Sequence, residues 1–219
     1  MPRLLFEKKG NAVWISHLDL MRLFQRAFKR AGLPLKHTQG FSPRPSVSIA
    51  LPLSVGVESD CELLDFELDA YEITCQEICG RLNSVLTDGV RVLDVYEEGR
   101  KIRDLSLLHC SCIMEYDAGI PENAVSELEA LFRRPSLIVP KKSKNGIQDQ
   151  DIIPMIREIT ISAAGEREIA INAIICCQNP TLNPAQLLLA AEREMPYLKP
   201  DFSRCARIEI FDNGNNVFR

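Results

Sequence analysis

Four basic side chains near the start of the chain are spaced so that they could bind a row of phosphates. Arg22, Arg26, Lys29 and Arg30 follow one another at intervals of four, three and one residues. In an α-helix this spacing places them on one side, along a segment about 20 Å long. Guanidinium and ammonium groups in such a row contact phosphate oxygens and position a nucleic acid without reading its sequence. The alternative interpretation is an ordinary solvated helix face.

A loop with one glycine and two prolines follows the basic segment. It runs from Lys36 to Pro45 and holds Phe41 between Gly40 and a proline-containing turn. Phe41 could stack on an unpaired base, as readers of single-stranded RNA require, or it could pack into the core. The candidate RNA-binding or phosphate-binding residues are Arg22, Arg26, Lys29, Arg30, Lys36, His37, Phe41 and Arg44.

Charge is distributed unevenly along the chain. The formal net charge is −4, but residues 1–50 contain nine Lys or Arg and two Asp or Glu, which leaves the other 169 residues strongly acidic. A separation of this kind indicates an anionic partner for the basic segment. The alternative is that acidic residues from the rest of the chain cover the basic segment in the folded protein.

His17 and His37 are the weak candidates for catalysis. Two histidines beside a phosphate-binding surface could act as acid and base in cleaving RNA through its 2′-hydroxyl. Phosphate contact or helix capping is the simpler alternative for both, and His109 is expected to be structural. No catalytic residue is therefore assigned.

The cysteines and the glycines predict neither a metal site nor a cofactor. None of the eight cysteines shows the two-residue spacing of a zinc knuckle, and we expect reduced thiols, as in cytoplasmic proteins. Phosphate-binding P-loop and dinucleotide glycine patterns are also lacking. No apolar run is long enough to span a bilayer, and the first residues lack the apolar segment of a signal peptide. We therefore expect a cytoplasmic protein without a membrane partner.

The first half shows the element order β-α-β-β-α-β. The expected elements are a strand at 2–9, a helix capped by Ser16, strands at 46–51 and 62–69, a helix opened by a Thr74–Glu77 capping box, and a strand at 90–96. Gly32 and Pro34 end the first helix. This order is that of a ferredoxin-like domain.

The second half is expected to repeat the order. The elements are a strand at 107–116, a helix at 121–132, strands at 136–140 and 152–161 around a turn with Lys141, Lys142, Lys144 and Asn145-Gly146, a strand at 168–176, a helix to Glu194 and a strand at 204–211. The sequence thus predicts the α+β class, with two tandem ferredoxin-like domains built on antiparallel sheets, at 1–98 and 105–219.

Several runs resemble a bacterial family. They are Trp14–Arg22, Arg26-Ala27, Arg30–Pro34, Gln39–Pro45 and Ala50–Ser59. Together they are similar to the radical-SAM-linked domain of unknown function, whose members are encoded beside, or fused to, a cobalamin-binding radical SAM protein. The resemblance is dense over residues 3–70. Arg44 stands where members commonly have His, which counts against histidine chemistry in this loop.

The resemblance implies an association with a radical SAM partner. It favours a non-catalytic accessory protein that presents RNA, such as tRNA or rRNA, to that enzyme for modification. A protein-interaction module that docks on the partner without RNA is one alternative. A metal-independent endoribonuclease is another, since the tandem order is similar to that of RAMP-type CRISPR repeat endoribonucleases, an analogy of fold alone.

Overall fold

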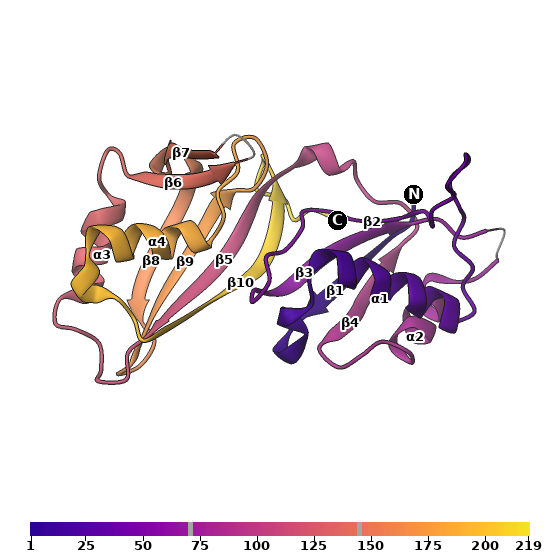
Figure 1. Cartoon of the computed structure of the whole chain (residues 1–219), viewed down its shortest axis with the longest axis horizontal. Coiled ribbons are helices and arrows are strands. Elements are labelled where there is room, and N and C mark those ends of the chain that lie inside the picture. Colours follow the sequence, from indigo (N-terminus) through magenta and orange to yellow (C-terminus); the bar gives the residue numbers. More distant parts are fainter. Residues whose placement is uncertain (70–71, 144–145) are drawn as a thin grey trace. The chain divides into compact units, whose positions relative to one another are not determined.

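A computed structural model describes residues 1–69, 72–143 and 146–219. The protein has a mixed α+β fold that divides into two compact units, which are described separately below. Unit 1 comprises Met1–Asp104 together with Phe218–Arg219, and unit 2 comprises Leu105–Val217. Both chain ends therefore belong to unit 1 (Figure 1).

Unit 1 is an antiparallel sheet with two helices. Its strands are β1 (Arg3–Lys8), β2 (Val47–Ile49), β3 (Glu58–Phe66) and β4 (Val90–Tyr96). They pair in the order β4-β1-β3-β2. Helices α1 (His17–Arg30) and α2 (Cys75–Asn83) share one hydrophobic cluster with Leu4, Phe6, Leu64 and Phe66 of the sheet. Because these strand residues alternate in the chain, both helices cover the same face.

Local sequence determines the start and end of α1. Ser16 Oγ accepts a hydrogen bond from the Asp19 backbone N–H, which caps the helix as predicted. Gly32 follows the C-cap with a φ of +68°, a conformation that glycine adopts without strain. Four residues of α1 are buried, namely Leu20, Phe24, Ala27 and Phe28, so the basic residues lie on the side that faces away from the core.

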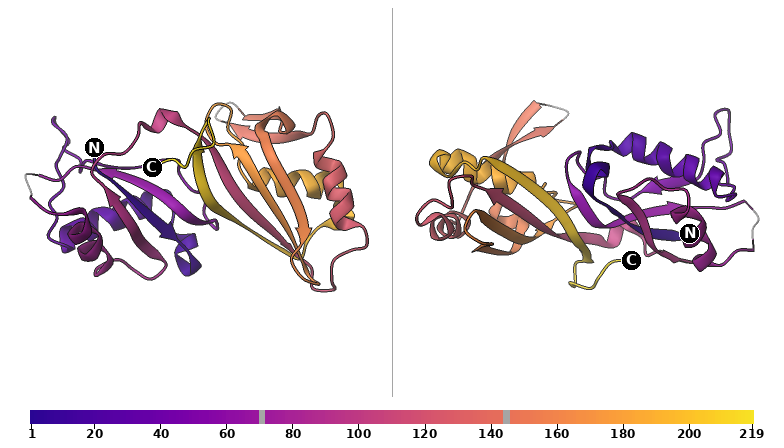
Figure 2. Two further views of the ribbon diagram at one scale, coloured as in Figure 1. Left: turned by 180° about the vertical axis from the view of Figure 1, so that it is seen from behind. Right: turned by 90° about the horizontal axis from the view of Figure 1, so that it is seen from below.

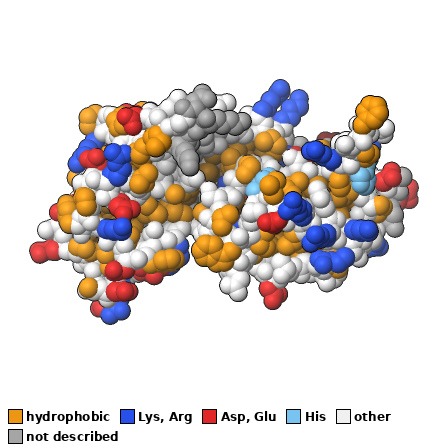
Figure 3. Space-filling model, in the orientation of Figure 1, with side chains coloured by type: hydrophobic (Ala, Val, Ile, Leu, Met, Phe, Trp, Pro, Cys, Tyr) orange, Lys and Arg blue, Asp and Glu red, His pale blue; other side chains and the backbone are white. Residues whose placement is uncertain are grey.

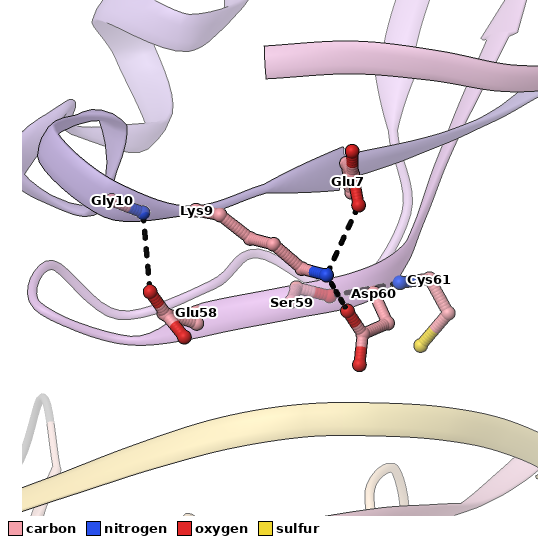
Figure 4. Close-up of polar contacts among 7 residues, drawn as sticks. All are labelled: Glu7, Lys9, Gly10, Glu58, Ser59, Asp60 and Cys61. Atoms are coloured by element: carbon pink, nitrogen blue, oxygen red, sulfur yellow. Dashed lines mark hydrogen bonds and ion pairs between the residues drawn. The ribbon is translucent and has the colours of Figure 1, made fainter. Parts of the chain in front are cut away.

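A 3-10 turn, η1 (Gly10–Trp14), joins β1 to α1 and was not predicted. Lys9 Nζ contacts Glu7 at 3.1 Å and Asp60 at 2.6 Å, and the Gly10 N–H donates to Glu58 Oε1 at 3.1 Å (Figure 4). Two hydrogen bonds raise the pKa of Lys9: the one to Asp60 has the largest effect, and the one to Glu7 the next largest. These contacts hold the turn against the beginning of β3.

Unit 2 is also built on antiparallel strands. Its strands β5 (Leu105–Glu115), β8 (Ile156–Ala163), β9 (Glu168–Cys176) and β10 (Phe202–Asp212) pair in the order β10-β5-β9-β8. Its helices are α3 (Ala124–Phe132) and α4 (Ala185–Glu194). Two short 3-10 turns, η3 (Ile153–Met155) and η4 (Pro196–Leu198), adjoin β8 and α4, whereas η2 (Ile102–Asp104) ends the main segment of unit 1.

The predicted hairpin in unit 2 differs from the structure. Strand β6 (Ile138–Ser143) pairs with β7 (Gly146–Asp151) in a sheet of its own, separate from the main strands of the unit (Figure 2). The segment expected to form one strand from 152 begins instead as η3 and becomes β8 only at Ile156. Pro154 lacks the N–H that a ladder needs, and the polar β7 offers no apolar face. Lys144 and Asn145 of the predicted turn lie outside the described residues.

Among the helices of the described residues, none has the length and apolar character needed to cross a membrane.

Candidate functional site

Three arginines of α1 line one open groove. Arg22, Arg26 and Arg30 border a hollow of about 570 Å³ together with Ile15, Asp19, Leu23 and Thr87. We call this hollow the arginine groove. Successive arginines are four residues apart, which is a rise of about 6 Å along the helix axis, so the three guanidinium groups form a row. Figure 3 shows Lys and Arg side chains gathered over α1 on this face.

The charges of the groove are held in place but hardly neutralised. Arg22 Nη1 donates to Asp19 Oδ1 at 2.9 Å, and Arg30 Nη2 donates to the Val85 carbonyl at 2.7 Å. A carbonyl fixes a guanidinium without removing its charge. Arg26 is exposed, and its charge acts on Asp19 more weakly than that of Arg22 does. The groove therefore presents three cations and one carboxylate.

Asp19 stays ionised beside these arginines. Its hydrogen bond with Ser16 is the largest influence, and the contact with Arg22 is the next; both lower its pKa. The Ser16 hydroxyl donates to Asp19 Oδ2 at 2.8 Å. Asp19 thus serves the helix cap while it competes with an anionic ligand for Arg22.

The loop after α1 forms an arm, residues 37–45. Its two sides are joined by the Thr38 N–H, which donates to the Arg44 carbonyl at 2.9 Å, and by the Arg44 N–H, which donates to Thr38 Oγ1 at 3.0 Å. At the base, the Ser46 N–H donates to the Lys36 carbonyl at 2.7 Å. Phe41 is fully exposed. It therefore does not pack into the core, which was one of the two interpretations of this residue in the sequence.

The remaining predicted residues are dispersed. Lys29 is exposed on α1, and Lys36 forms a long ion pair with Glu67 at 3.8 Å. His17 is the first residue of α1, whereas His37 follows its far end. The helix between them has 14 residues, about 21 Å of axis. The structure does not bring these two histidines together.

Part of the basic segment is used within unit 1. Arg3 Nε pairs with Asp65 at 2.6 Å, and Lys8 Nζ donates to the Val13 carbonyl at 3.0 Å; both side chains are buried. Lys9 is bound to Glu7 and Asp60 as described above. Acidic residues of β3 therefore neutralise some cations of residues 1–50, and the exposed positive charge is concentrated on α1.

Sequence reasoning missed one residue that lines the arginine groove and two apolar residues that are exposed near the beginning of α1. Thr87 enters the arginine groove from the connection between α2 and β4, which no local pattern indicates. Trp14 and Leu18 are 69% and 67% exposed at the beginning of α1. An apolar residue beside the polar stripe of an amphipathic helix is the signal that could have identified Leu18.

The cysteines form no metal site in the described part of the chain. All eight are free thiols, five of them buried, and no group of three potential ligands is found there. Cys112 and Cys205 face each other on β5 and β10, with their sulfur atoms 2.6 Å apart. Burial raises the pKa of the Cys177 thiol to about 12, which keeps it protonated and unreactive.

Comparison with known proteins identifies a family. No curated protein matches the sequence. A solved structure described as "Crystal Structure of an Unknown Protein from Galdieria sulphuraria" aligns over 96% of both chains, at 11% identity and a TM-score of 0.26. A family model described as "Uncharacterized protein conserved in bacteria (DUF2344)" matches residues 2–184. Because this match covers most of the chain, the protein belongs to that family of uncharacterized proteins conserved in bacteria.

Proposed function

We propose that this chain is a cytoplasmic RNA-binding accessory protein that presents RNA to a radical SAM enzyme. The observation that carries the proposal is the arginine groove, in which three guanidinium groups share one carboxylate. Such a row suits phosphate oxygens, because planar guanidinium groups form paired, charge-assisted hydrogen bonds with them. The radical SAM partner rests on the family resemblance of residues 3–70.

The concentration of charge on α1 supports this assignment. Unit 1 as a whole contains 15 Lys or Arg and 15 Asp or Glu, so the positive surface is local. A local row of cations on a neutral unit favours a ligand with regularly spaced negative charges. The exposed Phe41 arm adds an aromatic side chain on which an RNA base could stack.

We further propose that both units are ferredoxin-like domains. The argument is the strand order, β4-β1-β3-β2 in unit 1 and β10-β5-β9-β8 in unit 2, with two helices in each. In unit 2 the β6–β7 hairpin is then an insertion between α3 and β8. Antiparallel sheets of this order hold RNA in other proteins, but that is an analogy of fold.

Salt titration of RNA binding tests the proposal. Filter binding of total cellular RNA should weaken steeply as salt rises, because each phosphate that the protein neutralises releases counterions. The variant Arg22→Ala/Arg26→Ala should reduce the log–log slope by about 1.4, because each single-strand phosphate that is no longer neutralised lowers the slope by about 0.7. Arg133→Ala removes an exposed cation of unit 2 and is the matched control, which should leave the slope unchanged.

Absent or salt-insensitive RNA binding would exclude the proposal, as would an equal loss in the Arg133→Ala control. The partner is tested by co-purification with the radical SAM protein that the family resemblance leads us to expect. If RNA bridges this chain and the radical SAM protein, that protein should be retained in the presence of RNA and released by ribonuclease.

Docking on an acidic protein surface is the second candidate function. The exposed Leu18, one helical turn before Arg22, favours it, because interfaces combine apolar contacts with rim charges. Co-purification that resists ribonuclease, and that Arg26→Glu abolishes, together with no RNA affinity, would select this candidate.

A further inference from the structure

Trp14 is an exposed aromatic ring on a well-fixed backbone. It ends η1 immediately before the Ser16 cap, and 69% of its surface is accessible. One part of the indole lies beside Gly56, where an added Cβ would be 3.5 Å from Trp14 Cζ3. The ring is thus supported on one side and open on the other.

Several hydrogen bonds hold the backbone beneath this ring. The Val13 carbonyl accepts from Lys8 Nζ at 3.0 Å and from the Gly56 N–H at 2.9 Å. The Ile15 N–H donates to the Ala12 carbonyl at 3.0 Å. Since Lys8 and Val13 are buried, the position of Trp14 is determined before any ligand binds.

The exposed ring of Trp14 is next in the chain to Ile15, which lines the arginine groove. Trp14 precedes the first turn of α1, Arg22 to Arg30 occupy the rest of it, and the Phe41 arm follows its C-terminal end. Hydrophobic side chains also reach the surface beside the N-terminal end of α1 in Figure 3. An aromatic ring thus lies beyond each end of the row of cations.

We infer that Trp14 stacks on an unpaired base of a strand whose phosphates occupy the arginine groove. This inference rests on the proposed function and narrows its ligand to single-stranded RNA, including the loops of a folded RNA. In a duplex the faces of a base are covered by its neighbours, so only an unstacked base can lie on the indole. Stacking on aromatic rings tolerates any base, which agrees with a site whose other contacts are with phosphates.

The fluorescence of Trp14 gives a direct test, because the chain has a single tryptophan. The probes are oligouridylate and oligoadenylate of about ten nucleotides, the duplex formed by these two strands, and heparin as a polyanion without bases. Either single strand should quench Trp14 and saturate at the concentration at which anisotropy of a labelled strand shows binding. The duplex and heparin should bind, if at all, without quenching.

Variants of this site separate stacking from apolar contact. Trp14→Ala should weaken single-strand binding between about fivefold and a hundredfold and leave the salt slope unchanged, while Trp14→Phe should retain most of the affinity. Leu18→Ala removes an equally exposed apolar side chain and should have little effect. Circular dichroism of each variant checks that the fold is intact.

The outcomes distinguish this inference from the proposed function. Salt-dependent binding of single strands without quenching, and unaffected by Trp14→Ala, would overturn the inference and leave the proposed function standing. No binding of any RNA in the anisotropy assay at low salt would overturn both. Quenching by polyglutamate but by no oligonucleotide would assign Trp14 to protein docking and overturn the inference as well.

Discussion

Replacing Lys8 by Met should destabilise unit 1, because it removes a buried cation that interacts with the charge of Glu62. Lys8 and Glu62 are 1% and 0% exposed. Burial lowers the pKa of Lys8, and the negative charge of Glu62 opposes that shift. Met keeps the apolar stem of the side chain but removes both the positive charge and the hydrogen bond to the Val13 carbonyl.

The expected loss is about 3 kcal/mol in the free energy of unfolding. Removing one member of a buried charge pair costs about 3–5 kcal/mol, and the lower value applies because the Val13 carbonyl keeps its hydrogen bond from Gly56. With a urea slope of about 2 kcal/mol per molar, the midpoint should fall by about 1.5 M. Lys8→Met/Glu62→Gln should recover part of the loss, since it removes the buried negative charge together with the buried cation.

Urea unfolding followed by Trp14 fluorescence is the assay. The only tryptophan lies in unit 1, so the signal reports on this unit even if the two units unfold separately. A midpoint within about 0.3 M of the wild type, or a double variant weaker than the single one, would refute the reasoning.

Two further predictions concern the carboxylate of the groove and a buried phenol. Asp19→Asn should strengthen RNA binding severalfold, because it frees Arg22 from its partner at 2.9 Å. It should also slightly destabilise α1, because it removes a negative charge from the first turn of the helix. Unchanged or weaker RNA binding at low salt would contradict the first expectation. Burial raises the pKa of Tyr116 to about 12, and its hydroxyl donates to the Leu198 carbonyl at 2.8 Å. Its stabilising effect should be complete below about pH 10, the pKa of an unfolded tyrosine, and be lost as the pH rises toward 12. Alkaline unfolding of Tyr116→Phe, which cannot ionise there, should lack this pH dependence, and an identical profile would show that another group is responsible.

Much of α1 follows from the sequence alone. The Ser16 cap and Gly32 after the last turn are local features, and the structure confirms both of them. The Thr74–Glu77 capping box of α2 is confirmed for the same reason. In a helix, the spacing of residues along the sequence directly indicates which side chains contact each other, because residues three or four positions apart are neighbours.

The hairpin of unit 2 shows where such local reasoning ends. β6 pairs with β7 in a separate sheet, and this pairing depends on which strands pack together in the core of unit 2. Alternating patterns identify strands but do not state their partners. The predicted pairing of 136–140 with 152–161 was wrong for this reason.

The sequence by itself determined that a basic amphipathic helix exists and how its cations are spaced. Only the tertiary structure decided which charges remain available: Arg3 is taken by Asp65, and Lys8 is buried beneath the Val13 carbonyl. It also decided that Trp14 lies exposed beside Gly56 and that His17 and His37 are kept apart. These outcomes depend on residues tens of positions away, whose proximity results from the packing of the whole unit rather than from any local pattern.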